Sequence, residues 1–295
     1  MIKEHKKTIS IIIITLCSIF FISSINLVES TIFAKKRIKV AVSILPQKKF
    51  IEEIAGKKVE VVTVIPPGYS PTNYSPSPRE MSNLSDAKLY FSLGLPAEKA
   101  GILSKIRSFN QNIRVIRLDK RVFEKYSSRK FSSGSIDPHI WLSPRRVEYM
   151  IEIIKTNLAK LDKENKQIYK ENAKVYKNKI NKLDDYIHNN LNSLNKDTFI
   201  IYHPVLGYFA KDYNLNMVVI EKEGKKAAPR HIQEIIDLGH ERKIKSVFYQ
   251  KTVTSRQAEM IAEELGGKTI KIDPFSLNYI ENMKKITYLL KKYLK

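Results

Sequence analysis

The sequence predicts an α/β protein of two lobes, each with a four-stranded, mainly parallel sheet flanked by helices, the two joined by one long connecting helix. Two observations predict this fold. Short β-branched runs alternate with amphipathic helical stretches, first before residue 120 and again after residue 196. A long charged stretch without glycine separates the two halves. Because alternating strands and helices form parallel sheets with crossover helices, each half is expected to form one lobe.

The individual elements follow from the hydrophobic pattern. In the first half, the runs that predict strands are residues 38–45, 59–65, 89–93 and 113–118. In the second half, they are residues 198–202, 217–220, 246–249 and 269–272. Helical periodicity predicts helices at 48–55, 79–86, 231–242 and 255–265, and residues 278–294 predict a last helix.

The stretch from Pro144 to about Asn195 predicts the connecting helix. Its apolar residues keep approximate helical spacing in a charged background: Ile168, Val175, Leu183, Ile187, Leu191 and Leu194. A helix of roughly 30 residues is about 45 Å long, which is enough to span both lobes. A coiled coil is the alternative, but these positions do not hold a strict heptad. The expected organisation is therefore a signal peptide (1–34), an N-terminal lobe (35–162), a connecting helix (163–195) and a C-terminal lobe (196–295).

The composition is that of a globular protein with a strong positive charge. An apolar fraction of 43% with 28% charged residues argues against disorder. The net charge of +22 first indicates nucleic acid as a partner. However, lysine is spread along the chain among acidic residues, and no stripe of basic and aromatic residues stands out. No nucleic-acid partner is therefore expected, whereas contact with an anionic membrane surface agrees with the charge.

The N-terminus has the pattern of an export signal. Lys3, Lys6 and Lys7 precede an apolar stretch over residues 9–28, and Ala34 offers a cleavage point. The protein is therefore expected outside the cytoplasm, in the periplasm or its equivalent, with an uncleaved anchor as the alternative. The single cysteine, Cys17, lies inside this stretch. The mature chain then offers no thiolate, so any metal must be held by nitrogen and oxygen.

Two of the six histidines occupy stiff positions in the sequence. His139 lies between Pro138 and Pro144 beside the single tryptophan, just before a helix for which Ser143 is a suitable N-cap. His203 ends an apolar run and precedes Pro204, so it is expected at the carboxyl end of a parallel strand. Open α/β sheets bind their ligands at such strand ends. His5 lies in the signal stretch, and His188 and His240 lie in polar helical surroundings. His231 follows Pro229 and Arg230 at a predicted helix start, where a site role is the alternative to a structural one.

A carboxylate joins the two histidines in the predicted arrangement. Asp273 ends the last predicted strand, and a polar, proline-rich loop at 66–76 follows the second strand. Two neutral imidazoles and a carboxylate suit a borderline divalent cation, and binding should weaken as the histidines become protonated. The alternative is that each histidine caps or packs locally and that Asp273 belongs to a turn with Pro274.

Several segments resemble the metal-binding solute-binding proteins of zinc and manganese ABC transporters, the cluster A-I family. Residues 40–46 resemble the family's first strand, and residues 65–71 its first ligand loop. The motif DPHIWLSP at 137–144 is close to its most recognisable segment. Residues 202–210 resemble its third ligand motif, 272–274 its fourth, and 163–195 its connecting helix. The resemblance covers nearly the whole mature chain.

The resemblance implies a ligand set with one departure. His139, His203 and Asp273 match the second, third and fourth ligands, whereas the first position, usually histidine, is Asn73. Asn73 can bind directly through its amide oxygen, water or another carboxylate can complete the shell, or the specificity can have shifted. We favour a core of His139, His203 and Asp273, with Asn73 as a weak or outer ligand.

The same resemblance implies the metal and the partner. A histidine at the third position favours Zn²⁺, while the oxygen of Asn73 suits harder ions, so Mn²⁺ or Fe²⁺ is the alternative. The expected function is that of an extracytoplasmic substrate-binding protein. It would capture the ion between its lobes as a monomer and deliver it to the permease of an ABC transporter, and it would not be an enzyme.

Two other classes of protein are weighed against this expectation. A zinc hydrolase also uses two histidines, a carboxylate and an open water position, with a nearby general base. Glu98 is the candidate base that the strand pattern places near the crevice. A surface adhesion protein with a structural metal is the second rival. A receptor should enclose its metal between the lobes, whereas an enzyme should leave it open in a pocket.

Overall fold

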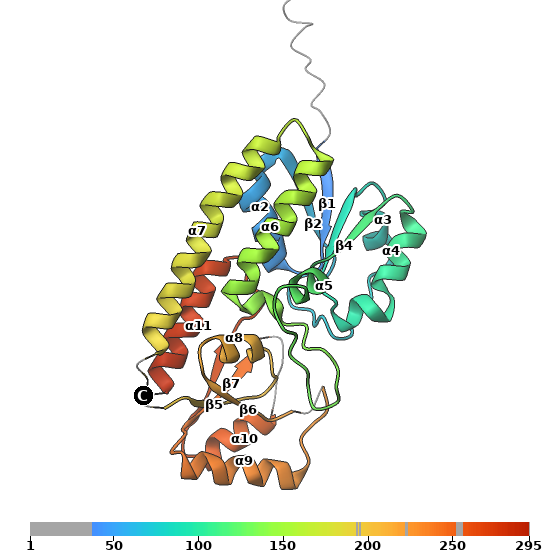
Figure 1. Ribbon diagram of the computed structural model, residues 1–295. Coiled ribbons are helices and arrows are strands. Elements are labelled where there is room, and N and C mark those ends of the chain that lie inside the picture. The colour runs from blue at the N-terminus through green and yellow to red at the C-terminus, as the bar shows by residue number, and fades with distance from the viewer. Residues whose placement is uncertain (1–36, 193, 195, 222–223, 252–255, 295) are drawn as a thin grey trace, which may run out of the picture. The chain divides into compact units, whose positions relative to one another are not determined.

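Two parallel sheets form the framework of the protein (Figure 1). The computed structural model describes residues 37–192, 194, 196–221, 224–251 and 256–294, so the predicted signal peptide lies outside the described residues. The first sheet contains β1 (Ile38–Val42), β2 (Val59–Thr63), β3 (Leu89–Ser92) and β4 (Arg114–Arg117). The second contains β5 (Thr198–Ile201), β6 (Asn216–Val219), β7 (Ser246–Gln250) and β8 (Lys268–Ile272).

The two sheets share one topology. Their strand orders are β2-β1-β3-β4 and β6-β5-β7-β8, and every pairing is parallel. The central strands β3 and β5 are buried along their whole length, as expected for strands covered by helices on both faces. All eight predicted strands are present, and the predicted fold class is confirmed.

Helices connect the strands in both halves. The first half has α2 (Leu45–Ala55), α3 (Pro78–Ser82), α4 (Leu103–Phe109) and α5 (Leu118–Phe123). The second has α8 (Gly207–Asp212), α9 (Pro229–Glu241), α10 (Arg256–Glu264) and α11 (Tyr279–Tyr293). Over the part of the chain that the structure describes, no helix is long and apolar enough to cross a membrane.

The segment between the sheets forms two helices, α6 (Pro144–Leu161) and α7 (Lys166–Leu191). α7 is the predicted connecting helix, and Leu183, Ile187 and Leu191 are buried as the pattern indicates, but the first half of the helix packs differently. Ile168 and Val175 are 39% and 56% exposed. The buried positions are Tyr169, Ala173, Tyr176, Ile180, Leu183, Ile187 and Leu191. In the first half of α7, Tyr169 and Tyr176 are therefore the buried side chains, where the sequence pattern predicts Ile168 and Val175.

α7 contacts both halves of the molecule. Near its start, Asn172 Nδ2 donates to the carbonyl of Ile54 in α2 (3.1 Å). Near its end, Asn190 Oδ1 accepts from Lys291 Nζ in α11 (2.9 Å). Figure 1 shows α7 alongside α6 and α11. The domain boundaries at residues 162 and 195 stay a prediction.

The two lobes share a hydrophobic core. Phe50 of α2 and Tyr279 of α11 meet edge to face with ring centroids 5.0 Å apart, and both side chains are fully buried. One continuous cluster of buried residues includes strands from both sheets together with α6, α7 and α11. A smaller cluster covers the other face of the second sheet. Since interiors are close-packed, the shared core favours small movements between the lobes.

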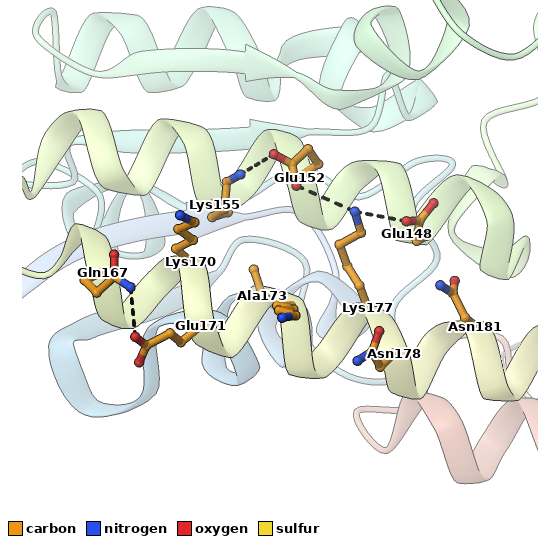
Figure 2. Close-up of a pocket in the computed structure, with 11 residues that line it drawn as sticks. Glu148, Glu152, Lys155, Gln167, Lys170, Glu171, Ala173, Lys177, Asn178 and Asn181 are labelled. Atoms are coloured by element: carbon orange, nitrogen blue, oxygen red, sulfur yellow. Dashed lines mark hydrogen bonds and ion pairs between the residues drawn. The ribbon is translucent and has the colours of Figure 1, made fainter.

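A polar groove lies along the outer side of the α6–α7 pair (Figure 2). Lys177 forms an ion pair with Glu148 (3.0 Å), and Lys155 forms one with Glu152. Gln167 and Glu171 are joined by a hydrogen bond of 2.8 Å. Because Lys177 of α7 pairs with Glu148 of α6, and the other two pairs lie within one helix each, we interpret the groove as part of the helix packing.

Candidate metal-binding site

One pocket brings together side chains from both halves of the chain. It is lined by residues from the first half, including Asn73, Leu95, Pro96, Phe131 and His139, and by His203, Glu221, Gly224 and Gln250 from the second half. His203 follows β5, Glu221 follows β6 after one residue, and Gln250 ends β7. The carboxyl ends of parallel strands thus form one wall, as in other open α/β sheets.

His139 is held by the chain directly before it. Residues 129–137 fold back on themselves, with Lys130 bridged to Ile136 and Asp137 N donating to the carbonyl of Arg129 (2.8 Å). Asp137 Oδ1 then accepts from both the backbone N–H (3.0 Å) and Nδ1 (2.7 Å) of His139. This pair of bonds fixes the ring, which lies beside the ring of Trp141 (centroids 5.2 Å apart).

Burial favours the neutral form of His139. Burial lowers the pKa of His139 below its usual value, although the nearby Asp137 carboxylate opposes this shift. Burial alone would raise the pKa of Asp137, but His139 and Arg129 together lower it below its usual value. Arg129 Nη1 donates to Asp137 Oδ2 at 2.9 Å. Since the Asp137 carboxylate only accepts, Nδ1 of His139 carries the proton and Nε2 keeps a free lone pair.

His203 has a similar partner from a neighbouring strand. Its Nδ1 is hydrogen-bonded to Oε1 of Glu221, which also accepts from Gly224 N (3.1 Å). Glu221 is 8% exposed and stands at the pocket wall. When Nδ1–H of His203 donates this hydrogen bond, the lone pair of Nε2 stays available to a metal, as in the carboxylate–histidine arrangement of metal sites.

The two free nitrogens converge. His139 Nε2 and His203 Nε2 are 3.4 Å apart. Two nitrogens bound to one tetrahedral Zn²⁺ at about 2.0–2.1 Å are themselves about 3.3–3.4 Å apart. Two acceptor lone pairs at this distance repel one another unless a cation or a proton lies between them. The geometry of the pair therefore fits a shared metal ion.

The other two predicted ligands lie differently. Asn73 is exposed and lines the histidine pocket. Asp273 does not line this pocket but a neighbouring one, with Lys251, Lys271 and Asn282. Its Oδ1 accepts from Phe275 N (3.0 Å), which is the local turn considered as the alternative for this residue. Within the described residues, no group of three or more His, Cys, Asp or Glu side chains is arranged to hold a metal.

Sequence reasoning missed two residues of the pocket. Glu221 directly follows the predicted strand 217–220, so the rule that identified His203 applies to it equally. Gln250 directly follows the predicted strand 246–249 and is 6% exposed. Its side-chain oxygen is buried without a hydrogen-bond partner. Both add oxygen atoms to the second-lobe wall.

Glu98, the candidate general base, is turned into the first lobe. It is fully buried and accepts hydrogen bonds from the backbone N–H groups of Leu93 (3.1 Å), Gly94 (2.6 Å) and Leu95 (2.9 Å). Tyr90 (3.0 Å) and Ser43 donate hydroxyl hydrogen bonds to it as well. Glu98 therefore holds the loop that lines the pocket and does not reach into it.

Comparison with known proteins identifies the family. The family model described as ZnuA, the periplasmic zinc-uptake complex component A, matches residues 40–293. The high-affinity zinc uptake system protein ZnuA of Bacillus subtilis (strain 168) is 25% identical over 245 residues, covering 79% of this chain and 77% of that protein. The zinc-binding lipoprotein AdcA of Streptococcus pneumoniae (strain ATCC BAA-255 / R6) is 24% identical over 308 residues, covering 97% of this chain but 61% of AdcA.

A solved structure agrees in fold and sequence. A crystal structure of ZnuA superimposes with a TM-score of 0.83 at 30% identity, covering 88% of this chain and 100% of that one. The chain therefore belongs to the ZnuA family, the periplasmic component A proteins of zinc-uptake complexes.

Proposed function

We propose that this protein captures Zn²⁺ between its two lobes, outside the cytoplasm, and delivers the ion to the permease of an ABC transporter. One observation carries the proposal: two imidazole Nε2 atoms from different lobes face each other at the 3.4 Å expected of two ligands on one tetrahedral ion. Export is supported by the N-terminal sequence, and delivery to a permease by the family to which the chain belongs.

The proposed ligand core is His139 and His203 through Nε2. Asn73, at the pocket rim, supplies an amide oxygen. Asp273 remains a predicted ligand, and its binding would require its carboxylate to leave the hydrogen bond with Phe275 N. Glu221 is the carboxyl group that lines the histidine pocket, where it offsets the charge of a divalent ion.

Zinc is proposed over Mn²⁺ or Fe²⁺ because imidazole nitrogen forms the core of the site. One observation favours the harder ions as the second candidate. Asn73, Glu221 and Gln250 place several oxygen-bearing side chains around the two histidines. Competition between Zn²⁺ and Mn²⁺ for metal-stripped protein decides between the two, and zinc is expected to displace manganese.

An enzymatic role is set aside for this chain. Members of its family are solute-binding proteins rather than enzymes. Glu98, the base considered for a zinc hydrolase, is fully buried and engaged by five hydrogen-bond donors.

Calorimetry on metal-stripped protein tests the capture of zinc. The wild type is expected to bind Zn²⁺ in the submicromolar range. His139→Ala and His203→Ala are each expected to lose more than about 100-fold in affinity, beyond the 10–100-fold typical of residues that only support a ligand. His240→Ala, which removes an exposed histidine of α9, should bind as the wild type does. Wild-type protein that gives no heat with Zn²⁺ or Mn²⁺ would contradict the proposal.

A further inference from the structure

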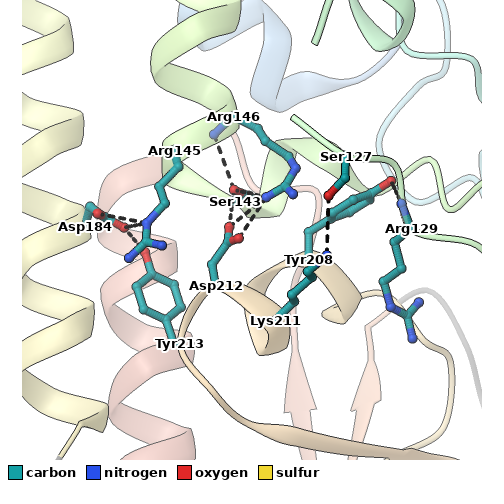
Figure 3. Close-up of polar contacts among 10 residues, drawn as sticks. All are labelled: Ser127, Arg129, Ser143, Arg145, Arg146, Asp184, Tyr208, Lys211, Asp212 and Tyr213. Carbon is teal, nitrogen blue, oxygen red and sulfur yellow. Dashed lines mark hydrogen bonds and ion pairs between the residues drawn. The ribbon is translucent and has the colours of Figure 1, made fainter. Parts of the chain in front are cut away.

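The helix α8, which begins four residues after His203, reaches across to the chain segment that carries His139 (Figure 3). Tyr208 is the centre of this contact. Its hydroxyl accepts from the backbone N–H of Arg129 (3.0 Å) and donates to the carbonyl of Asp137 (2.9 Å). One hydroxyl thus joins both ends of the folded-back segment 129–137, two residues before His139.

First-lobe side chains enclose the Tyr208 ring. Phe123 stacks on it with centroids 6.5 Å apart, and the Arg146 guanidinium lies 4.4 Å from its centroid. Tyr208 is fully buried, and burial raises its pKa to about 12. The hydroxyl therefore keeps its proton and remains a donor to Asp137.

At Gly207, the backbone of α8 comes close to the side chains of Arg129 and Asp137. A Cβ atom at this position would lie 2.6 Å from both Arg129 Nη1 and Asp137 Oδ2. These two atoms form the ion pair that supports the carboxylate partner of His139. The backbone of α8 thus packs directly against that ion pair, and only glycine leaves room for it.

The other end of α8 holds the chain on the far side of His139. Asp212 accepts from Arg146 Nη1 with both carboxylate oxygens (2.9 Å each) and from the hydroxyl of Ser143. Ser143 is the N-cap of α6, where its hydroxyl accepts from Arg146 N (3.3 Å). α8 therefore binds the segment around His139 both before and after the histidine.

We propose that α8 is a clamp that sets the position of His139 relative to His203, with Gly207, Tyr208 and Asp212 as its positioning residues. The inference rests on the proposed capture of a metal ion by these histidines. α8 begins four residues after His203 and is hydrogen-bonded to the chain on both sides of His139. A displacement of one histidine is therefore transmitted to the other. A metal site needs its ligands held within about 0.5 Å, which this clamp provides across the two lobes.

The test compares two tyrosines of the same helix region. Tyr208→Phe removes the hydroxyl that bridges Arg129 and Asp137. Tyr213→Phe removes a hydroxyl that is hydrogen-bonded to Asp184 of α7 and is not part of the Arg129–Tyr208–Asp137 bridge (Figure 3). Both are studied as the full mature chain. The readouts are the visible absorption spectrum of bound Co²⁺, which reports ligand geometry, the release rate of Zn²⁺ to a chelator, and the thermal unfolding of metal-free protein.

The clamp predicts that Tyr208→Phe alters the Co²⁺ spectrum and speeds Zn²⁺ release about tenfold. Tyr213→Phe should leave both unchanged, whatever it does to thermal unfolding. Equal spectra for the wild type and Tyr208→Phe would overturn the clamp, as would equal changes in both variants. If the wild type binds neither ion, the proposed capture itself fails, which separates the two hypotheses.

A second pair of variants tests the same proposal without changing the Tyr208 hydroxyl. Gly207→Ala should displace the Arg129–Asp137 pair and change the Co²⁺ spectrum in the same direction as Tyr208→Phe. Gly101→Ala is the matched control, because an added Cβ there meets nothing within 4 Å. A Gly207→Ala protein that folds and binds Co²⁺ with the wild-type spectrum would contradict the role of α8.

Discussion

The two walls of the histidine pocket are built in different ways. In the first lobe, the partner of His139 is only two residues away, fully buried and paired with Arg129. In the second lobe, the partner of His203 comes from the next strand, 18 residues later, and lies on the pocket surface. The His139 side chain is 6% exposed and that of His203 is 16% exposed.

The two histidines are therefore oriented in different ways: His139 by a residue of its own segment, and His203 by a residue that strand pairing brings next to it. The ring of His139 is oriented within its own segment, by Asp137 two residues away, and α8 contacts that segment from the second lobe. His203 and Glu221 meet only because β5 and β6 pair in the observed register, with Ile201 opposite Val219. The first-lobe wall should therefore be the more rigid and the more costly to alter, and the second-lobe wall the easier to adjust.

Among changes to the residues that support the two histidines, the largest effect is expected from Asp137→Asn. The amide removes the carboxylate that orients His139 and leaves Arg129 without its buried partner. We expect zinc affinity to fall about 10–100-fold and the free energy of unfolding to fall by about 1–3 kcal/mol. Calorimetry and urea unfolding of metal-stripped protein measure the two. Lost stability with unchanged affinity would show that Asp137 serves the fold alone.

Glu221→Gln is the matched change in the second lobe. It keeps the shape of the side chain but weakens the acceptor for His203 Nδ1. Zinc affinity should fall about tenfold, while the free energy of unfolding should stay within about 0.5 kcal/mol because no buried ion pair is broken. A loss of stability equal to that of Asp137→Asn would contradict the proposal that the first-lobe wall is the more costly to alter.

Much of the fold could be predicted from sequence because the strands are short, β-branched and separated by helical periods. The packing face of the first half of α7 could not, because Tyr169 and Tyr176 are amphipathic and their burial depends on what lies opposite. Phe50 of α2 fills that place against Tyr176, with centroids 6.4 Å apart. Such a partner lies far away in the sequence and leaves no local signal.

The site was only partly accessible from sequence for a related reason. A strand end places a residue at the right edge of a sheet but does not fix the direction of its side chain. The strand-end rule predicts His203 and Asp273, and the proline-bounded segment predicts His139. In the structure His139 and His203 line one pocket, and the Asp273 carboxylate accepts from Phe275 N beside a neighbouring pocket. Glu98 was expected at the crevice, but three backbone N–H groups draw it inward.

A smaller effect concerns Glu98, which holds the first-lobe loop. Burial raises the pKa of Glu98 above its usual 4.5, although hydrogen bonds from Ser43 and the Leu93 backbone oppose the shift. A carboxyl group whose pKa is higher in the folded state gives stability that is complete below its unfolded pKa. That stability is lost as the pH rises through the folded pKa.

The free energy of unfolding of the wild type, measured relative to Glu98→Gln, should therefore decrease from pH 4.5 towards neutrality. Urea unfolding of the metal-free proteins at a series of pH values measures this difference. A difference that stays constant, or that grows with pH, would show that hydrogen bonding outweighs burial at Glu98. The first-lobe wall would then contain an ionised carboxylate at Glu98 as well as at Asp137.

The smallest effect is expected at Gln250, on the second-lobe wall. An unpaired buried acceptor costs about 1–3 kcal/mol, and replacing it with an apolar group of similar shape is nearly neutral or stabilising. Gln250 Oε1 is such an acceptor. Gln250→Met should therefore unfold at the same or a slightly higher temperature than the wild type when metal-free. Loss of an oxygen from the pocket should also weaken Mn²⁺ binding more than Zn²⁺ binding. If Gln250→Met were clearly less stable, or lowered the affinity for both ions equally, the second-lobe wall would be as tightly built as the first.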